Sequence, residues 1–236
     1  MRALRIETTE RPPATSLRIA GLDCLLDASG ALVVPGERTL VVADLHLEKG
    51  SAFARRGAML PPYDTRATLA ALDEVLAHYR PETVVALGDS FHDRRGPERL
   101  GGPEAAALAA CVAGRRWIWI TGNHDPVLPP EIGGEVAAEG LIGPLVLRHH
   151  PAAGDAQELA GHLHPVAKVA LHGRSVRARA FLTDGRRCVL PAFGAYAGGL
   201  NACDAAFRPL FPSGFTAHII GRNRLFAVAR SVLCGD

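Results

Sequence analysis

The sequence predicts an α/β fold in which the central strands pair in parallel. Short apolar runs rich in β-branched residues alternate with stretches whose apolar residues recur at helical spacing. Three of these strand-like runs end in polar motifs, at Asp44, Asp89 and Asn123. Alternating strands and helices favour a parallel sheet, and open α/β sheets bind ligands beyond the carboxyl ends of their strands. The three motifs therefore mark the expected site.

The N-terminal half carries the alternation. We predict one amphipathic helix from Asp64, as its N-cap, to Tyr79, and a second helix at about 103–113 that ends before Gly114. Strands are expected at 17–19, 22–26, 31–34, 39–43, 83–87 and 117–120. The later part of the chain reads as mostly β, with strands expected at 145–147, 168–171, 176–181, 188–190, 217–220 and 225–228.

Composition is that of an ordinary globular protein. The 236 residues are 48% hydrophobic and 21% charged with a formal net charge of +2, which excludes a disordered or collagen-like chain and names no partner. Residues 1–16 are polar and are expected to form a loose arm before a single domain at 17–236. The chain contains no apolar run near the roughly 18 residues of a membrane span, and its five cysteines form no CxxC pair. We expect a cytoplasmic protein without membrane association.

Polar motifs recur along the chain and together predict a metal site. Each motif alone is a weak signal, because a lone Asp-x-His is common by chance. Together they supply imidazoles, carboxylates and an amide oxygen, which suit manganese, iron or zinc better than calcium. We predict two divalent transition-metal ions, manganese first, with iron, zinc or nickel as alternatives. The predicted ligands are Asp44, His46, Asp89, Asn123, His149, His162 and His164.

The spacing of these residues has a physical logic. On an extended segment, residues i and i+2 point to the same side, so Asp44 and His46 are expected to hold one ion. His162 and His164 have the same spacing. A glycine before Asp89 allows a tight turn that sets its carboxylate between two ions. Two ions about 3.5 to 4 Å apart activate water and clamp a phosphoryl group.

The ordered motifs D-x-H, G-D, G-N-H-D, H-x-P and G-H-x-H resemble those of the calcineurin-like metallophosphoesterase superfamily over residues 41–165. The resemblance implies a four-layer α/β/β/α sandwich. It also implies that His124 contacts the phosphate and assists the leaving group, with Asp125 as its orienting partner. Either His149 or His150 can be the ligand in the H-x-P motif, and the superfamily pattern favours His149. The implied ligands are Asp44, His46, Asp89 and His164 for one ion, and Asp89, Asn123, His149 and His162 for the other.

Longer strings resemble one bacterial branch. DLHLEKGSAFARRG, PPYDTRATL, LGDSFHD and LPAFGAYAGGLNA are similar to the ligase-associated DNA damage response endonuclease family, PdeM. That resemblance implies a phosphodiesterase that cuts DNA, with DNA repair proteins as partners. We expect single-stranded DNA as the substrate and endonucleolytic cleavage. The same metal chemistry also suits a nucleotide or cyclic-nucleotide phosphodiesterase, which stays open as an alternative.

Two other classes are disfavoured by the motifs. Phosphoprotein phosphatases carry G-D-x-V-D-R-G and G-N-H-E, where this chain has GDSFHDRRG and GNHD. A binding scaffold without activity would be expected to lack ligands or the histidine of GNHD, and none of these is missing.

Residues beside the ligands have two interpretations each. His92, Arg94 and Arg95 are candidate substrate contacts, although the same segment could simply begin a helix at the surface. Glu48 and Lys49 could form a surface ion pair, or Lys49 could contact a phosphate. The glycine-rich stretch 194–201 could let a nucleic acid backbone approach closely, or could be an irregular turn between strands.

Overall fold

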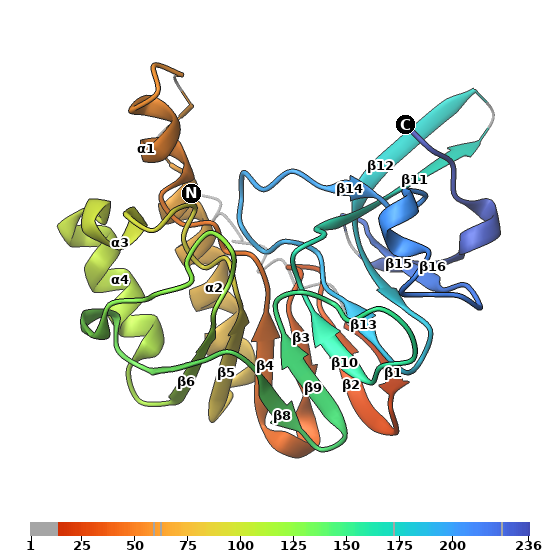
Figure 1. Ribbon diagram of the computed structural model, residues 1–236, viewed down its shortest axis with the longest axis horizontal. Helices are drawn as coiled ribbons and strands as arrows, with labels where there is room; N and C mark the ends of the chain where they lie inside the picture. The colour runs from red at the N-terminus through yellow and green to blue at the C-terminus, as the bar shows by residue number, and fades with distance from the viewer. Residues whose placement is uncertain (1–13, 59, 62, 172, 223) are drawn as a thin grey trace, which may run out of the picture.

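A computed structural model describes residues 14–58, 60–61, 63–171, 173–222 and 224–236. Two β-sheets pack against each other, and the α-helices lie beside the first sheet (Figure 1). The predicted α/β sandwich is confirmed. In the described part of the chain, no helix is long and apolar enough to cross a membrane.

The first sheet is antiparallel at one end and parallel at the other. Its strands lie in chain order, antiparallel from β1 to β4 and parallel from β4 to β7. The parallel pairing of β4, β5 and β6 is the arrangement that the sequence predicts. The strands are β1 (Thr15–Ile19), β2 (Leu22–Leu26), β3 (Leu32–Val34), β4 (Thr39–Val42), β5 (Thr83–Leu87), β6 (Arg116–Ile120) and β7 (Glu135–Ala137).

The N-terminal strand begins earlier than expected. Of the arm predicted at 1–16, residues 1–13 lie outside the described residues, and Thr15 already pairs with Leu26 in the first sheet. The strand predicted from Leu17 therefore gains two residues at its start.

Helix α2 (Asp64–Tyr79) covers one face of the parallel strands. Its apolar residues, such as Leu69 and Leu72, join a core cluster with Leu40 and Val84 of the sheet. The N-cap residue is Tyr63, so the prediction that Asp64 caps the helix is wrong; Asp64 begins the helix, and its carboxylate accepts the Gly50 N–H at 3.0 Å. The other α-helices are α1 (Lys49–Ala54), α3 (Gly96–Arg99) and α4 (Gly102–Val112), of which only α4 was expected.

The second sheet is built almost wholly from the later half of the chain. Strands β9 and β10 pair in parallel, and β11 and β12 form a hairpin that projects beyond the sheet (Figure 1). The strands are β8 (Gly140–Ile142), β9 (Leu145–Arg148), β10 (Glu158–Ala160), β11 (Pro165–Leu171), β12 (Arg174–Thr183), β13 (Cys188–Val189), β14 (Leu200–Asn201), β15 (Thr216–Ile220) and β16 (Leu225–Ala229).

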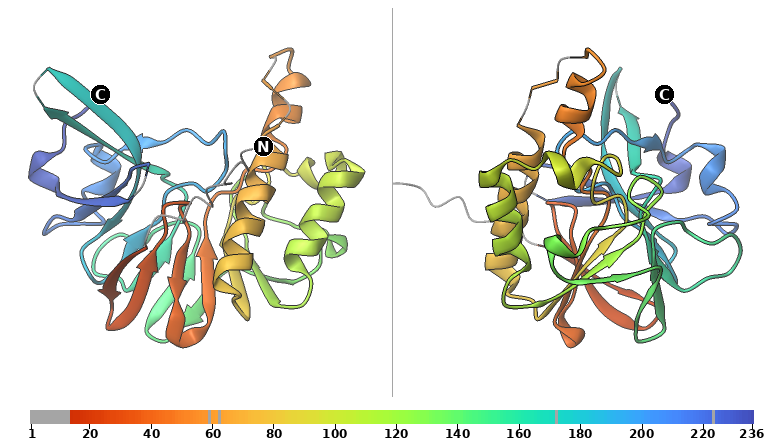
Figure 2. Two further views of the ribbon diagram at one scale, coloured as in Figure 1. Left: turned by 180° about the vertical axis from the view of Figure 1, so that it is seen from behind. Right: turned by 60° about the vertical axis from the view of Figure 1, so that its left-hand side comes forward.

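The fourth layer of the sandwich contains no α-helix among the described residues. The outer face of the second sheet is covered by the 3₁₀ turns η3 (Ala205–Phe207) and η4 (Arg230–Val232) and by coil near them. Phe207, Phe211 and Leu233 pack there against Ala180 and other sheet residues. Figure 2 shows the α-helices gathered on the opposite side of the molecule.

The two sheets enclose the central core. Ile19, Leu32 and Val41 of the first sheet form one buried cluster with Leu147 and Phe181 of the second. Because both sheets are fixed by this cluster, the loops that follow their strands are held at a shared edge, where the predicted ligands lie.

Replacing Leu72 by Ala should lower the free energy of unfolding by about 2 to 5 kcal/mol, because it removes a fully buried side chain between α2 and the sheet. Glu74→Ala, on the exposed face of the same helix, should change it by no more than about 0.5 kcal/mol. Urea unfolding measures both values, and equal effects of the two substitutions would contradict the packing described here.

Candidate active site

The predicted ligands lie on backbone of unusual conformation. Five of them have positive φ: Asp44 (53°), His46 (44°), Asp89 (46°), His162 (69°) and His164 (44°). The prediction that Asp44 and His46 share a side because their segment is extended is therefore wrong. Left-handed residues alternate there with Leu45 and Leu47, which are 1% and 0% exposed. The leucines point into the core, and this anchors the loop with its polar side chains facing the site.

Left-handed conformations cost about 1 to 3 kcal/mol per non-glycine residue and persist only where the surroundings hold them. Here the loop after β4 is hydrogen-bonded to the loop after β5. The N–H of Asp44 donates to Gly88 O at 3.2 Å, and the N–H of His46 donates to Asp89 O at 2.9 Å. The two loops thus hold each other, and the carboxylates of Asp44 and Asp89 are brought to one place.

Residues 193–200, here called the strap, support the loop after β4 and the segment that contains His164. Phe193 N–H donates to Ala43 O at 2.8 Å, Gly194 N–H to Asp44 O at 3.1 Å, and Leu200 N–H to His164 O at 3.1 Å. A Cβ atom at Gly194 would lie 2.3 Å from Leu45 O, so only glycine fits this approach. The glycine-rich stretch therefore positions the ligand loops, a role that neither sequence interpretation included.

One group of ligand atoms comes from three of these loop residues. His46 Nε2 lies 3.1 Å from His164 Nε2, and His164 Nε2 lies 3.2 Å from Asp44 Oδ1. Both contacts join atoms that could coordinate a metal ion. Their mutual distances, all within 4.8 Å, suit a single cation.

A second group converges around His149. Its Nε2 lies 3.0 Å from Asn123 Oδ1, 3.2 Å from His162 Nδ1 and 3.4 Å from Asp89 Oδ2. His149 Nδ1 faces Leu87 O at 2.9 Å, which orients the ring and leaves Nε2 toward the cluster. His149 is buried, whereas His150 is exposed and its ring lies against His162 at 3.8 Å between centroids.

The protonation of these residues suits ligands. Burial, reinforced by the charge of His164, lowers the pKa of His46 to about 3, and burial beside His150 and His149 lowers the pKa of His162 to about 4. Both rings are therefore neutral at neutral pH. Burial alone would raise the pKa of Asp89, but the hydrogen bond and charge of His149 outweigh it and lower the pKa to about 2.

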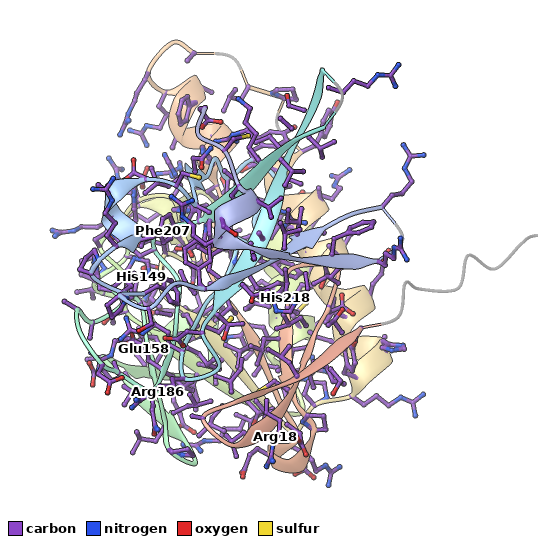
Figure 3. The ribbon with its side chains drawn as sticks, turned by 90° about the vertical axis from the view of Figure 1, so that its right-hand side faces the viewer. Arg18, His149, Glu158, Arg186, Phe207 and His218 are labelled. Carbon is purple, nitrogen blue, oxygen red and sulfur yellow. The ribbon has the colours of Figure 1, made fainter. Side chains whose placement is uncertain are left out.

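The segment after His149 is tied down by a buried ion pair. Glu158, at the start of β10, accepts the Ala152 N–H at 3.1 Å and lies 3.2 Å from Arg187 Nη1. Arg187 also donates to the carbonyl oxygens of Ala152 and Gly154. Figure 3 labels His149, which directly follows β9, and Glu158, the first residue of the neighbouring strand β10. This network holds the segment between His149 and β10 in place.

His124 stands beside the cluster with one ring nitrogen engaged. Its Nδ1 lies 2.6 Å from His92 O and its Nε2 lies 3.8 Å from Asp89 Oδ2. Asp125 was expected to orient this ring, but its carboxylate instead accepts the N–H groups of Phe91 and Gly122, each at 3.1 Å. The orienting group is the carbonyl of His92, which a motif of side chains does not reveal. Asp125 joins the loop after β5 to the loop after β6.

The candidate substrate residues lie in different environments. The His92 ring stacks on His124 with centroids 5.4 Å apart. Arg95 is exposed and paired with Glu98 at 3.0 Å, and Arg94 is exposed beside it. A surface pair of this kind contributes little to stability.

The expected ion pair between Glu48 and Lys49 is wrong. Glu48 is buried, and its carboxylate accepts the hydroxyl of Thr65 at 3.0 Å. The ammonium group of Lys49 instead donates to the carbonyl oxygen of Tyr196, in the strap, at 2.9 Å. The two side chains therefore point to different parts of the structure.

The residues of the cluster fit divalent cations. Carboxylates, imidazoles and an amide oxygen meet with their nitrogen and oxygen atoms within hydrogen-bonding distance of one another, and ring nitrogens of neighbouring histidines face each other. Such contacts between lone pairs are unfavourable unless a proton or a cation lies between them. Mixed nitrogen and oxygen ligands are typical of transition-metal sites.

Comparisons with known proteins agree with this site. The family model for calcineurin-like phosphoesterases matches residues 37–180. The chain belongs to this family and is a metal-dependent phosphoesterase.

Solved structures extend the comparison. The crystal structure of nuclease MPE from Pseudomonas putida is similar with a TM-score of 0.71 and 29% sequence identity, and the match covers 91% of this chain and 100% of that one. YfcE, a phosphoesterase from E. coli, matches with a TM-score of 0.39 and 16% identity over 81% of this chain and 98% of its own. No curated protein sequence matches the chain.

Gly88→Ala should weaken metal binding, because the new Cβ would lie 2.5 Å from the His149 ring and φ at this position is 77°. Equilibrium titration with Mn²⁺ should show a higher dissociation constant, and urea unfolding a loss of at least about 1 kcal/mol. Gly102→Ala is the matched control, since a Cβ there meets nothing within 4 Å. Metal binding equal to that of the wild type would show that the His149 ring is not held as a ligand.

Proposed function

We propose that this protein hydrolyses phosphodiester bonds of DNA and cuts single strands internally. The observation that carries the proposal is the similarity to a nuclease along 91% of the chain, at 29% identity. The convergence of the predicted ligands at the shared edge of the sheets supports it. The strings that resemble the DNA damage response endonucleases favour DNA repair as its setting and repair proteins as its partners.

The proposed ligands divide between two cations that share Asp89. The coordination of one ion would be completed by Asp44, His46 and His164. That of the other would be completed by Asn123, His149 and His162. Manganese is the proposed metal, because the set mixes imidazole nitrogens with carboxylate and amide oxygens. Divalent cations bound there supply Lewis acidity, which stabilises negative charge on a phosphoryl group and lowers the pKa of water.

His124 is the proposed proton donor. The carbonyl oxygen of His92 accepts a hydrogen bond from His124 Nδ1–H at 2.6 Å, which leaves Nε2 as the nitrogen that exchanges a proton with the substrate. Nε2 lies 3.8 Å from Asp89 Oδ2, beside the proposed ions rather than among their ligands. When protonated, Nε2 donates to the oxygen of the leaving nucleotide as its bond to phosphorus breaks.

His124→Ala should lower kcat about 10²- to 10⁴-fold while the protein keeps its metal and its fold, because only the proton donor is removed. Elemental analysis and circular dichroism check metal content and fold. His78→Ala, an exposed histidine on α2, is the control and should keep full activity. If His124→Ala loses metal instead, the histidine is a ligand and its proposed role is wrong.

The substrate is tested with a closed circle of single-stranded DNA, bis(4-nitrophenyl) phosphate and a cyclic nucleotide, each with Mn²⁺. We expect the circle to be cut, which requires an internal break. Because a strand presents several phosphates, its binding should weaken with salt more steeply than that of a mononucleotide, and it should weaken further when Arg94 and Arg95 are both replaced by Ala. Rapid hydrolysis of the cyclic nucleotide with DNA untouched at all salt concentrations would favour the small-molecule alternative.

A further inference from the structure

Helix α1 and the turn after it carry cationic side chains near His92. Burial, together with the nearby charges of Lys49, His124 and Arg56, lowers the pKa of the His92 ring to about 4. The ring of Phe53 lies 5.6 Å from the His92 ring, and the ammonium group of Lys49 lies 5.8 Å from the Phe53 ring. Phe53 of this short helix therefore lies between His92 and the ammonium group of Lys49.

Rings form a path from the proposed ions to this lysine. The centroid of His46, a proposed ligand, is 5.7 Å from that of His92, which in turn stacks on His124. Phe53 follows His92 at 5.6 Å. The ammonium group of Lys49, at the end of this path, therefore lies on the side of the cluster that carries His92 and His124.

The charge of Lys49 is not neutralised by a direct ion pair in the described part of the chain. One of its three N–H donors is used by Tyr196 O, which leaves two for a ligand. Burial lowers the pKa of Lys49, and the nearby Asp64 raises it by less. The Asp64 carboxylate accepts a hydrogen bond from the Gly50 N–H. Glu48 is turned away toward Thr65. A half-buried cation of this kind suits an anionic oxygen.

Helix α1 is held in place by Arg99. Arg99 of α3 pairs with Asp93 at 2.8 Å and donates to Ser51 Oγ of α1 at 2.8 Å. Arg99 therefore joins α1 to the segment that contains His92. Because the helix and the histidine are held by one side chain, Lys49 keeps a defined place relative to the site.

We infer that Lys49 binds the phosphate next to the scissile one, so that a polynucleotide is preferred over a substrate with a single phosphate. The inference rests on the proposed function, since only a nucleic acid strand presents a second phosphate at the neighbouring position. The phenyl ring of Phe53 beneath the ammonium group limits its hydration, which favours a fixed ligand over water. Arg56, exposed in the turn that follows α1, adds to the positive potential there.

The test compares a thymidine dinucleotide, which has one phosphodiester, with the same dinucleotide carrying a terminal phosphate at its 5′ end or its 3′ end. In the wild-type enzyme with Mn²⁺, one of the two terminal phosphates should raise kcat/KM about tenfold or more, the size expected for a charge-assisted hydrogen bond. Lys49→Gln should abolish this gain, mainly through KM, while its amide N–H can still donate to Tyr196 O. Lys49→Arg should keep most of it.

Lys168→Gln is the matched control, because the chain has only these two lysines and Lys168 lies on β11 in the second sheet. It removes the same charge and should keep the wild-type gain. A gain that survives in Lys49→Gln, or that falls equally in Lys168→Gln, overturns the assignment of Lys49. Hydrolysis of bis(4-nitrophenyl) phosphate with no cleavage of any dinucleotide or of DNA would instead overturn the proposed function itself.

Discussion

The carboxylate of Asp89 is the point on which the rest of the site depends. Its Oδ1 accepts the His124 N–H at 2.9 Å, and its Oδ2 lies 3.4 Å from His149 Nε2. A Cβ at Gly122 would come within 2.2 Å of this carboxylate, so the loop after β6 approaches it as closely as a backbone can. One side chain thus connects the loops that carry the two groups of proposed ligands and the proposed proton donor.

Such convergence needs backbone that is unfavourable in isolation. Ligand residues in left-handed conformation would relax if their loops were free, and they are held by hydrogen bonds between the loops after β4 and β5 and by the strap. The buried side chains of Leu45 and Leu47 also anchor the loop in the hydrophobic core. Contacts within the chain therefore hold these side chains in position, and such preorganisation is what electrostatic catalysis requires.

Much of the fold could be predicted from the sequence, because its signals are local. The apolar periodicity of α2 and the β-rich runs of β4, β5 and β6 depend on neighbours along the chain, and the structure has these elements close to their expected ranges. The short helix α1 was missed, since six residues are too few for a periodic pattern. The candidate ligands could be picked out because their motifs are ordered along the chain, and the structure brings these residues together.

The parts that could not be predicted depend on contacts between distant residues. The backbone carbonyl of His92 orients His124 across 32 residues, and Lys49 reaches Tyr196 across 147. Backbone carbonyls are the same at every position, so no sequence pattern marks the one that accepts a particular hydrogen bond. The role of Gly194 follows from the approach of Leu45 O, which is visible only in the folded chain.

Asp89 is proposed to hold two cations at once. The most direct measurement is the number of metal ions per chain at saturation, by elemental analysis after dialysis against Mn²⁺, for the wild type, for Asp89→Asn and for the control Asp73→Asn on the exposed face of α2. We expect two ions per chain in the wild type and in Asp73→Asn, and weakened binding of both ions in Asp89→Asn. One ion per chain at saturation, unaffected by Asp89→Asn, would contradict the account.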